Sequence, residues 1–207
     1  MRLLELFSGF GHVSGHFREH GWETLTLDYA KHLNADICID ILQWDYTVYP
    51  RDYFDAVWAS PDCTSWSIAT DKHRTLLEGL IPKTKTAVLG EKLIHRTLEI
   101  IKYFQPYFYI IENPRGRLRY FPPMKHTPFR TTVYYANYGF TYSKPTDLWS
   151  NVPLWEEQSK TGTELWGVVK KFNNTNMTRA TQRSIIPKPL IEKLFGVVNS
   201  YVRTCLD

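Results

Sequence analysis

The chain has 207 residues, of which 43% are hydrophobic and 15% aromatic, and its formal net charge is +4. This length allows one domain with a sizeable core, the composition marks no second domain, and the mildly basic charge permits a polyanionic partner. Three cysteines with neither disulfide nor zinc spacing, no apolar run near 20 residues and no signal-peptide pattern predict a soluble cytoplasmic protein without a metal or a membrane partner.

The opening of the chain predicts a nucleotide-binding unit. Arg2 to Phe7 is apolar enough for a buried strand, Ser8-Gly9-Phe10-Gly11 forms a glycine turn, and a helix follows from about His12 to His20. Glycines let the backbone approach a ligand closely, and the start of the helix presents free amide groups. This G-x-G lacks the full spacing of the dinucleotide fingerprint and is a weak signal alone.

Two further strands are expected to end in acidic residues. The strand Glu23 to Leu27 ends at Asp28, nineteen positions after Gly9, which is the spacing of an acid that accepts hydrogen bonds from a ribose. The strand Ile37 to Ile39 ends at Asp40, for which a helix cap and an adenine contact are both open.

A thiol follows the fourth predicted strand, Ala56 to Ala59. Cys63 would lie at the carboxyl edge of a parallel sheet, where open α/β folds bind ligands. It is a candidate nucleophile, and a small buried hydrophobe is the alternative. The polar stretch from Thr70 to Lys85 predicts a mobile loop that closes over substrate, and apolar spacing predicts a helix from Ala87 to Phe104.

The fifth predicted strand, Tyr107 to Ile111, ends in Glu112-Asn113-Pro114. A carboxylate after an apolar strand is costly unless it is needed, and an exposed strand end is the alternative for Glu112. Val133 to Ala136 and Thr146 to Trp149 predict an antiparallel pair with a turn at Tyr138-Gly139.

The last part of the chain predicts irregular structure or a short hairpin from Trp155 to Asn176 and a helix from Pro187 to Val202. The alternation of strands and helices indicates an α/β doubly wound sheet. Positive charge is concentrated between these elements, at Arg115, Arg117, Arg119, Lys125, His126 and Arg130.

The ordered motifs LFSGFG, LDYA, DI at 40 and 41, SPDC and ENP resemble those of the carbon-5 cytosine DNA methyltransferases. The resemblance runs from about residue 3 to residue 151, with a weaker echo in the last helix. IENPRGRLR and KPTDLWSN are similar to stretches of compact phage and viral members. It implies a Rossmann-like class I methyltransferase fold, a doubly wound and mostly parallel sheet with an antiparallel edge. Residues 1–207 would be one domain, with 151–186 in place of a target-recognition domain and 187–203 as the C-terminal helix.

The resemblance also implies a chemistry, with S-adenosylmethionine as cofactor and single- or double-stranded DNA as partner. Cys63 would add to carbon 6 of cytosine, and Glu112 would bond the Watson–Crick edge of the base. The residues implied in catalysis are Cys63, Glu112, Asn113 and Lys144. Those implied in cofactor binding are Phe7, Ser8, Gly9, Gly11, Asp28, Tyr29, Asp40, Ile41 and Pro61, and those in nucleic-acid binding are Arg115, Arg117 and Arg119.

Three features depart from the family pattern. Asp62 replaces the proline before the nucleophile, and its carboxylate should raise the pKa of the Cys63 thiol. The stretch Asn137 to Lys144 replaces Gln-x-Arg-x-Arg and keeps a basic residue only at Lys144. The 56 residues after Asn151 leave little room for target recognition, which predicts that sequence specificity is low or is supplied by something else. Two alternatives stay open: the same chemistry on a free cytosine nucleotide or RNA base, and an inactive binding module.

Overall fold

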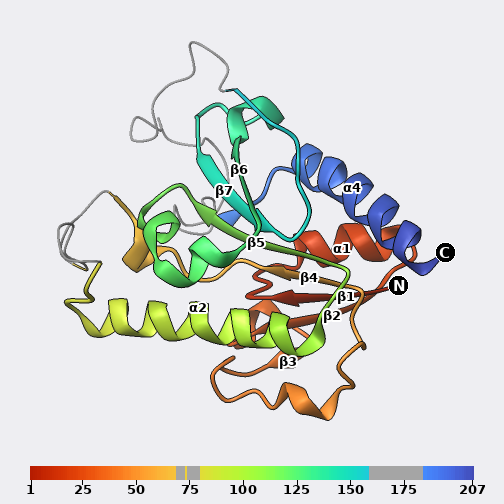
Figure 1. Ribbon diagram of the computed structural model, residues 1–207, viewed down its shortest axis with the longest axis horizontal. Helices are drawn as coiled ribbons and strands as arrows, with labels where there is room; N and C mark the ends of the chain where they lie inside the picture. Colours follow the sequence, from red (N-terminus) through yellow and green to blue (C-terminus); the bar gives the residue numbers. More distant parts are fainter. Residues whose placement is uncertain (69–72, 74–79, 159–183) are drawn as a thin grey trace.

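A mixed sheet forms the centre of the computed structural model, which describes residues 1–68, 73, 80–158 and 184–207 (Figure 1). Within these residues the sheet has seven strands in the order β3-β2-β1-β4-β5-β7-β6. The strands are β1 (Arg2–Leu6), β2 (Glu23–Asp28), β3 (Ile37–Cys38), β4 (Ala56–Ala59), β5 (Phe108–Pro114), β6 (Phe129–Tyr134) and β7 (Pro145–Ser150). Strands β1 to β5 are parallel, and β7 runs antiparallel to β5 and β6. The predicted doubly wound sheet with an antiparallel edge is confirmed.

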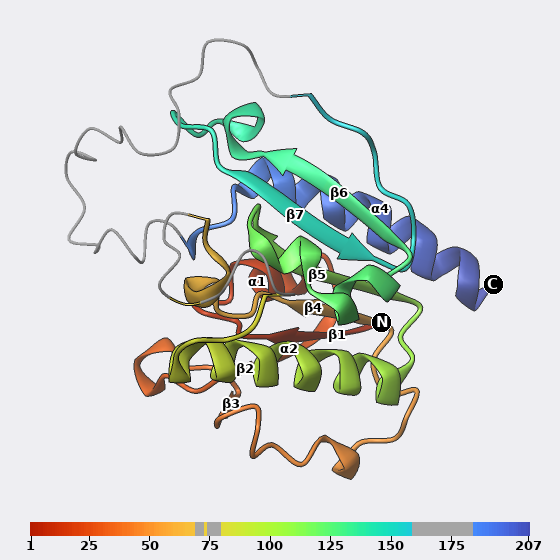
Figure 2. The same ribbon diagram turned by 60° about the vertical axis from the view of Figure 1, so that its left-hand side comes forward.

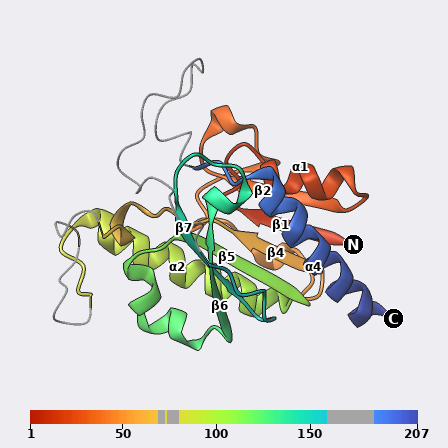
Figure 3. The ribbon, with the colours of Figure 1, turned by 90° about the horizontal axis from the view of Figure 1, so that it is seen from above.

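Helices cover both faces of this sheet (Figures 1 and 2). Helix α2 (Lys85–Phe104) lies on one face, and α1 (His12–Glu19) and α4 (Lys188–Leu206) lie side by side on the other (Figure 3). Val57 and Ala59 of β4 pack in the cluster that contains α2 residues, whereas Ala56 and Trp58 pack in the cluster of α1 and α4. Burial on both faces explains why β4 is an unbroken apolar run.

The fifth strand is longer than predicted. It continues through Glu112, Asn113 and Pro114, because these residues pair with Leu148, Asp147 and Thr146 of β7. Glu112 therefore lies within a hydrogen-bonded strand and not after its end. This position fixes the backbone of Glu112 more firmly than a loop would.

The edge strand β6 is placed differently from the prediction. The prediction of a strand over Val133 to Ala136 is wrong at its end, because β6 stops at Tyr134 and Tyr135–Tyr138 form a short 3-10 helix, η6. The predicted turn is present, since Gly139 has a φ of +91°. As a result, residues 135–144 lie at the carboxyl edge of the sheet, next to the end of β5.

The predicted helices are present with small shifts of their ends. Thr84 caps α2 by accepting a hydrogen bond from the Ala87 amide, and Gln105 ends it in the left-handed region. Most of the predicted loop from Thr70 to Lys85 and most of the stretch from Trp155 to Asn176 lie outside the described residues. Among the helices that the structure describes, none has the length and apolar character needed to cross a membrane.

Candidate active site

The turn after β1 has a left-handed backbone and contacts the end of β2. Phe7, Gly9 and Gly11 have φ angles of 58°, 55° and 67°, a region that costs a non-glycine residue about 1 to 3 kcal/mol. The Gly9 amide donates to Oδ2 of Asp28 over 3.0 Å, and the Ala30 amide donates to Oδ1 over 3.0 Å. The predicted glycine turn and the predicted acid therefore meet.

This turn can accept a polar ligand. A Cβ built on Gly9 would meet no heavy atom within 4 Å, so there is open space beside its backbone. The buried Ser8 hydroxyl has no hydrogen-bond partner among the residues that the structure describes. Each carboxylate oxygen of Asp28 keeps a second acceptor position. Tyr29 follows with 77% of its surface exposed. These groups fit a ligand that carries hydroxyls and an aromatic ring.

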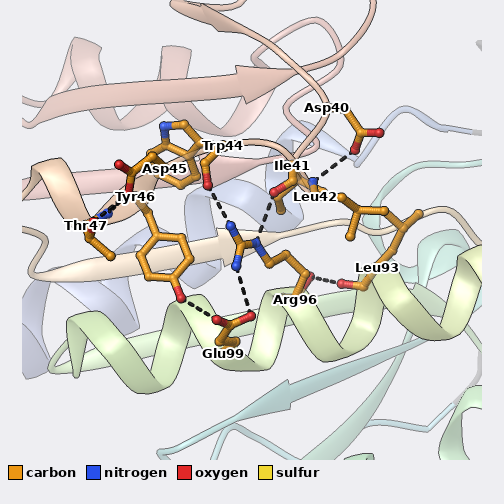
Figure 4. Close-up of polar contacts among 11 residues, drawn as sticks. Asp40, Ile41, Leu42, Trp44, Asp45, Tyr46, Thr47, Leu93, Arg96 and Glu99 are labelled. Atoms are coloured by element: carbon orange, nitrogen blue, oxygen red, sulfur yellow. Dashed lines mark hydrogen bonds and ion pairs between the residues drawn. The ribbon is translucent and has the colours of Figure 1, made fainter.

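Arg96 of α2 donates hydrogen bonds to the backbone of the segment that follows β3 and so holds it against the helix (Figure 4). Its Nε donates to the Ile41 carbonyl over 3.1 Å and its Nη2 to the Trp44 carbonyl over 2.6 Å. Its Nη1 donates to Glu99 over 3.0 Å, and the same carboxylate accepts from the Tyr46 hydroxyl over 2.6 Å. The guanidinium carbon lies 4.5 Å from the centroid of the Tyr46 ring. Sequence reasoning missed Arg96, because nothing in a helical pattern marks a residue that bonds carbonyls of another segment.

Asp40 and Ile41 begin this fastened segment. Oδ1 of Asp40 accepts a hydrogen bond from the Leu42 amide over 3.0 Å, and the residue is exposed. Ile41 is 3% exposed and packs in the core beside α2. Asp40 therefore caps a turn at residues 41–43 and not a helix, so the helix-cap prediction is wrong, and the adenine contact stays a prediction.

Asp62 forms the turn that carries the thiol. Its Oδ1 accepts from the Thr64 amide over 3.2 Å and from the Thr64 hydroxyl over 2.7 Å. Cys63 follows at φ −90° and ψ −4° and precedes the short 3-10 helix η3 (Thr64–Trp66). Hydrogen bonds of Asp62 thus restrain this turn, where a proline would do so through its ring. The carboxylate is engaged by Thr64 and does not bond the sulfur of Cys63.

The segment at the end of β5 holds both ends of this turn. Nδ2 of the fully buried Asn113 donates to the Pro61 carbonyl over 2.8 Å. The guanidinium of Arg117, only 3% exposed, donates to the Ser67 carbonyl. The prediction that Arg117 binds nucleic acid is wrong, because its guanidinium is used inside the protein to position the cysteine turn.

Arg119 is also engaged within the protein. It bonds Asp147 of β7 through contacts of 2.7 to 3.1 Å, and the Asp147 side chain is fully buried. Arg119 is thus held by an internal partner, and its nucleic-acid contact stays a prediction. Arg115 is exposed at the carboxyl edge, where its amide donates to the Pro145 carbonyl over 2.8 Å. Strand β6 begins at Phe129 and runs parallel to β5, so the other basic residues of this segment lie toward the opposite edge of the sheet. They are Lys125, His126 and Arg130.

Three ionisable groups interact at the carboxyl edge of the sheet: Cys63 after β4, Glu112 on β5 and Lys144 directly before β7. Cys63 is exposed at the surface, yet the protein around its sulfur is dense enough that burial, followed by Glu112 and Asp62, raises the pKa of the thiol to about 11. Lys144 acts in the opposite direction on that thiol. Burial lowers the pKa of Lys144 itself, while Glu112 and Cys63 act to raise it.

Tyr135, which the sequence did not single out, joins these groups. Its hydroxyl donates to Oε1 of Glu112 over 3.2 Å, and Nζ of Lys144 lies 4.5 Å from the centroid of its ring. Burial and the Glu112 charge hold the pKa of this hydroxyl far above its ordinary range. A nucleophile, a carboxyl group and a cation at one sheet edge can perform nucleophilic addition to an electron-poor ring. Among the described residues, no three His, Cys, Asp or Glu side chains are arranged to hold a metal ion.

Comparisons with known proteins identify a related sequence and related folds. No family model matches the chain. The chain is 35% identical over 158 residues to a protein of Frog virus 3 (isolate Goorha) named "Probable DNA (cytosine-5)-methyltransferase", which covers 73% of this chain and 71% of the relative.

Solved structures show the same fold. A protein encoded within an E. coli prophage and assigned as a DNA modification methyltransferase is similar with a TM-score of 0.50 and 14% identity, over 72% of this chain and 46% of that one. The S. pombe Dnmt2 methyltransferase is similar with a TM-score of 0.50 and 14% identity, over 79% and 58%. The chain thus spans about half the length of these proteins. At this identity the likeness shows the fold, which is the predicted Rossmann-like methyltransferase fold.

Proposed function

The chain belongs to the DNA (cytosine-5)-methyltransferase family, and from this premise we propose that it transfers a methyl group from S-adenosylmethionine to carbon 5 of cytosine in DNA. The observation that carries the proposal is the convergence of Cys63, Glu112 and Lys144 at the sheet edge, next to the turn in which Gly9 bonds Asp28. The nucleophile and the ligand turn lie on adjacent strands, β4 and β1.

The residues that would hold the cofactor surround the ends of β1, β2 and β3. Asp28 and the unpartnered Ser8 hydroxyl are suited to the hydroxyl and charged groups of S-adenosylmethionine. The left-handed turn at Phe7, Gly9 and Gly11 would shape the pocket, and the exposed Tyr29, Asp40 with Ile41, and Pro61 would line the adenine and the methyl end. When bound, the cofactor supplies an electrophilic methyl group.

Cys63 would act as the nucleophile on cytosine. Carbon 5 of the base becomes able to attack a methyl group only after a thiolate has added to carbon 6. The thiol must first lose its proton, and the ammonium of Lys144 is the nearby group that favours its ionised form. Attack of the sulfur forms the bond to carbon 6 and moves an electron pair into the ring.

Glu112 would hold the base while this charge develops. From its position on β5, its carboxyl group can hydrogen-bond the ring nitrogen and the exocyclic amine on the Watson–Crick edge. Asn113, which holds the Pro61 carbonyl, would keep β5 in register with the cysteine turn. Because carbon 6 cannot be reached inside a stacked duplex, a double-stranded substrate would have to turn its base outward. The exposed Arg115 at this edge is suited to a backbone phosphate.

The proposed organisation is one domain over residues 1–207, with 151–186 in place of a target-recognition domain. This arrangement supports low sequence specificity.

Covalent trapping tests the proposal directly. The protein is incubated with S-adenosylmethionine and 5-fluorocytosine in single-stranded DNA, double-stranded DNA or RNA, or with the free nucleotide, and adducts are detected by mass spectrometry. We expect a methylated DNA adduct on Cys63 that is lost in Cys63→Ala. An adduct confined to RNA or to the nucleotide would change the substrate, and cofactor binding without an adduct on any substrate would indicate an inactive binding module.

A further inference from the structure

We propose that Tyr135 is a positioning residue of the base pocket, where its hydroxyl orients Glu112 and its ring holds Lys144. The inference rests on the proposed function, because it assigns Glu112 and Lys144 to the cytosine. Tyr135 comes from the strand-to-turn junction at the end of β6, and its side chain reaches both groups across the intervening strand β7.

The backbone at Tyr135 explains how one side chain reaches both partners. Its amide donates to the Lys144 carbonyl over 3.4 Å, which closes the base of the loop formed by residues 135–144. Its carbonyl accepts from the Phe140 amide over 3.2 Å, which fixes the start of η6. Both backbone groups are engaged, which fixes the backbone at Tyr135, and the buried side chain extends from it to Glu112 of β5.

The hydroxyl of Tyr135 selects the orientation of the Glu112 carboxyl group. It donates to Oε1 over 3.2 Å, and the whole Tyr135 side chain is inaccessible to solvent. A buried hydroxyl that donates to a carboxylate is costly to lose, since neither partner can turn to water. With Oε1 engaged by Tyr135, we expect Oε2 to be the oxygen of Glu112 that bonds the base. One oxygen of Glu112 then bonds the base while the other stays bonded to Tyr135, so the orientation of the carboxyl group is fixed.

The ring of Tyr135 acts on the cation. Lys144 is only 4% exposed, and Nζ lies 4.5 Å from the ring centroid, within the range of a cation–π contact. An aromatic face lowers the cost of holding an ammonium away from water. The ring thus keeps the charge near the thiol without competing as a hydrogen-bond acceptor.

Two substitutions separate the two contacts. Tyr135→Phe removes the hydroxyl and keeps the ring under Lys144, whereas Tyr135→Leu removes both. Tyr109→Phe is the matched control, because Tyr109 is a half-buried tyrosine on the same strand as Glu112. Each variant is compared with the parent for kcat and KM on DNA, affinity for S-adenosylhomocysteine, thermal midpoint, and rate of Cys63 alkylation by iodoacetamide at pH 9.

The proposal predicts that each variant changes some of these measurements and leaves others as in the parent. We expect Tyr135→Phe to lower kcat at least tenfold, while the affinity for S-adenosylhomocysteine stays within twofold of the parent and alkylation of Cys63 is unchanged. We expect Tyr135→Leu to lower kcat further and also to slow alkylation, because Lys144 is then no longer held beside the thiol. Tyr109→Phe should match the parent.

Two results would overturn the proposal. One is a kcat of Tyr135→Phe within twofold of the parent. The other is a loss of kcat, cofactor affinity and thermal midpoint together, which would assign Tyr135 to the core alone. A parent protein that forms no adduct with 5-fluorocytosine would instead contradict the proposed function, so the two failures are distinguishable.

Discussion

Replacement of Glu5 by glutamine should make the protein more stable above neutral pH. Glu5 lies on β1 with 3% of its surface exposed, and its Oε2 accepts a hydrogen bond from the Ser14 amide over 2.8 Å. Burial raises the pKa of this carboxyl group from 4.5 to about 7. The hydrogen bonds from Ser14 act in the opposite direction and offset only part of this rise.

The size of the effect follows from this difference in pKa. Below pH 4.5 the Glu5 carboxyl group is protonated in both the folded and the unfolded chain. The folded state then carries no cost from ionising this buried group, and the free energy of unfolding is at its full value. As the pH rises toward 7, the unfolded chain ionises first and the folded state loses stability. The loss is about 3 kcal/mol in total, at about 1.4 kcal/mol per pH unit between the two pKa values. Above pH 7 it remains constant.

Urea unfolding at several pH values measures the effect. In Glu5→Gln the amide oxygen can still accept from Ser14, and the group no longer ionises. The free energy of unfolding of the variant relative to the parent should therefore increase by about 2 to 3 kcal/mol between pH 5 and pH 8. Because other titrating groups are common to both proteins, they cancel in this difference. Parallel pH profiles for the two proteins would refute the reasoning.

Two further substitutions test the site. Asp62→Asn keeps an oxygen for the Thr64 hydrogen bonds and removes a charge that raises the pKa of Cys63; the pH profile of Cys63 alkylation should move to lower pH, and an unchanged profile would contradict this. Arg96→Met removes the two hydrogen bonds to the segment after β3, so calorimetry should show an affinity for S-adenosylhomocysteine at least tenfold weaker. Arg51→Met, which removes a ring contact elsewhere on α2, is the control, and an equal loss in both variants would count against a specific role for Arg96.

The sheet and its ligand edge could be predicted because local signals decide them. Apolar runs bounded by glycine or polar residues mark β1, β2 and β4, and parallel strands bring their carboxyl ends together at one edge. The contact between Gly9 and Asp28 follows from this rule alone. The turn at Asp62 was also within reach, since aspartate forms such turns through its own side chain.

The remaining features depend on partners that are distant in the sequence. The length of β5 is set by pairing with β7, which begins more than thirty residues later. The alternating arginines show in the sequence as positive charge, but their partners do not. Arg119 bonds Asp147 and Arg117 bonds the Ser67 carbonyl, and these partners decide the role of each arginine. Tyr135 acquires its role only when the ends of β5, β6 and β7 lie together. Sequence reasoning therefore singled out Cys63, Glu112 and Lys144, which meet at the sheet edge, and missed Tyr135 and Arg96, whose partners are distant in the sequence.

The raised pKa of Cys63 in the exposed cysteine turn affects how long the thiol survives unmodified. With a pKa of about 11, only about one Cys63 thiol in ten thousand is ionised at pH 7. Oxidants and foreign electrophiles attack the thiolate and not the thiol, so Cys63 is modified slowly. Burial first, and then the charges of Glu112 and Asp62, thus protect the Cys63 thiol from such reagents.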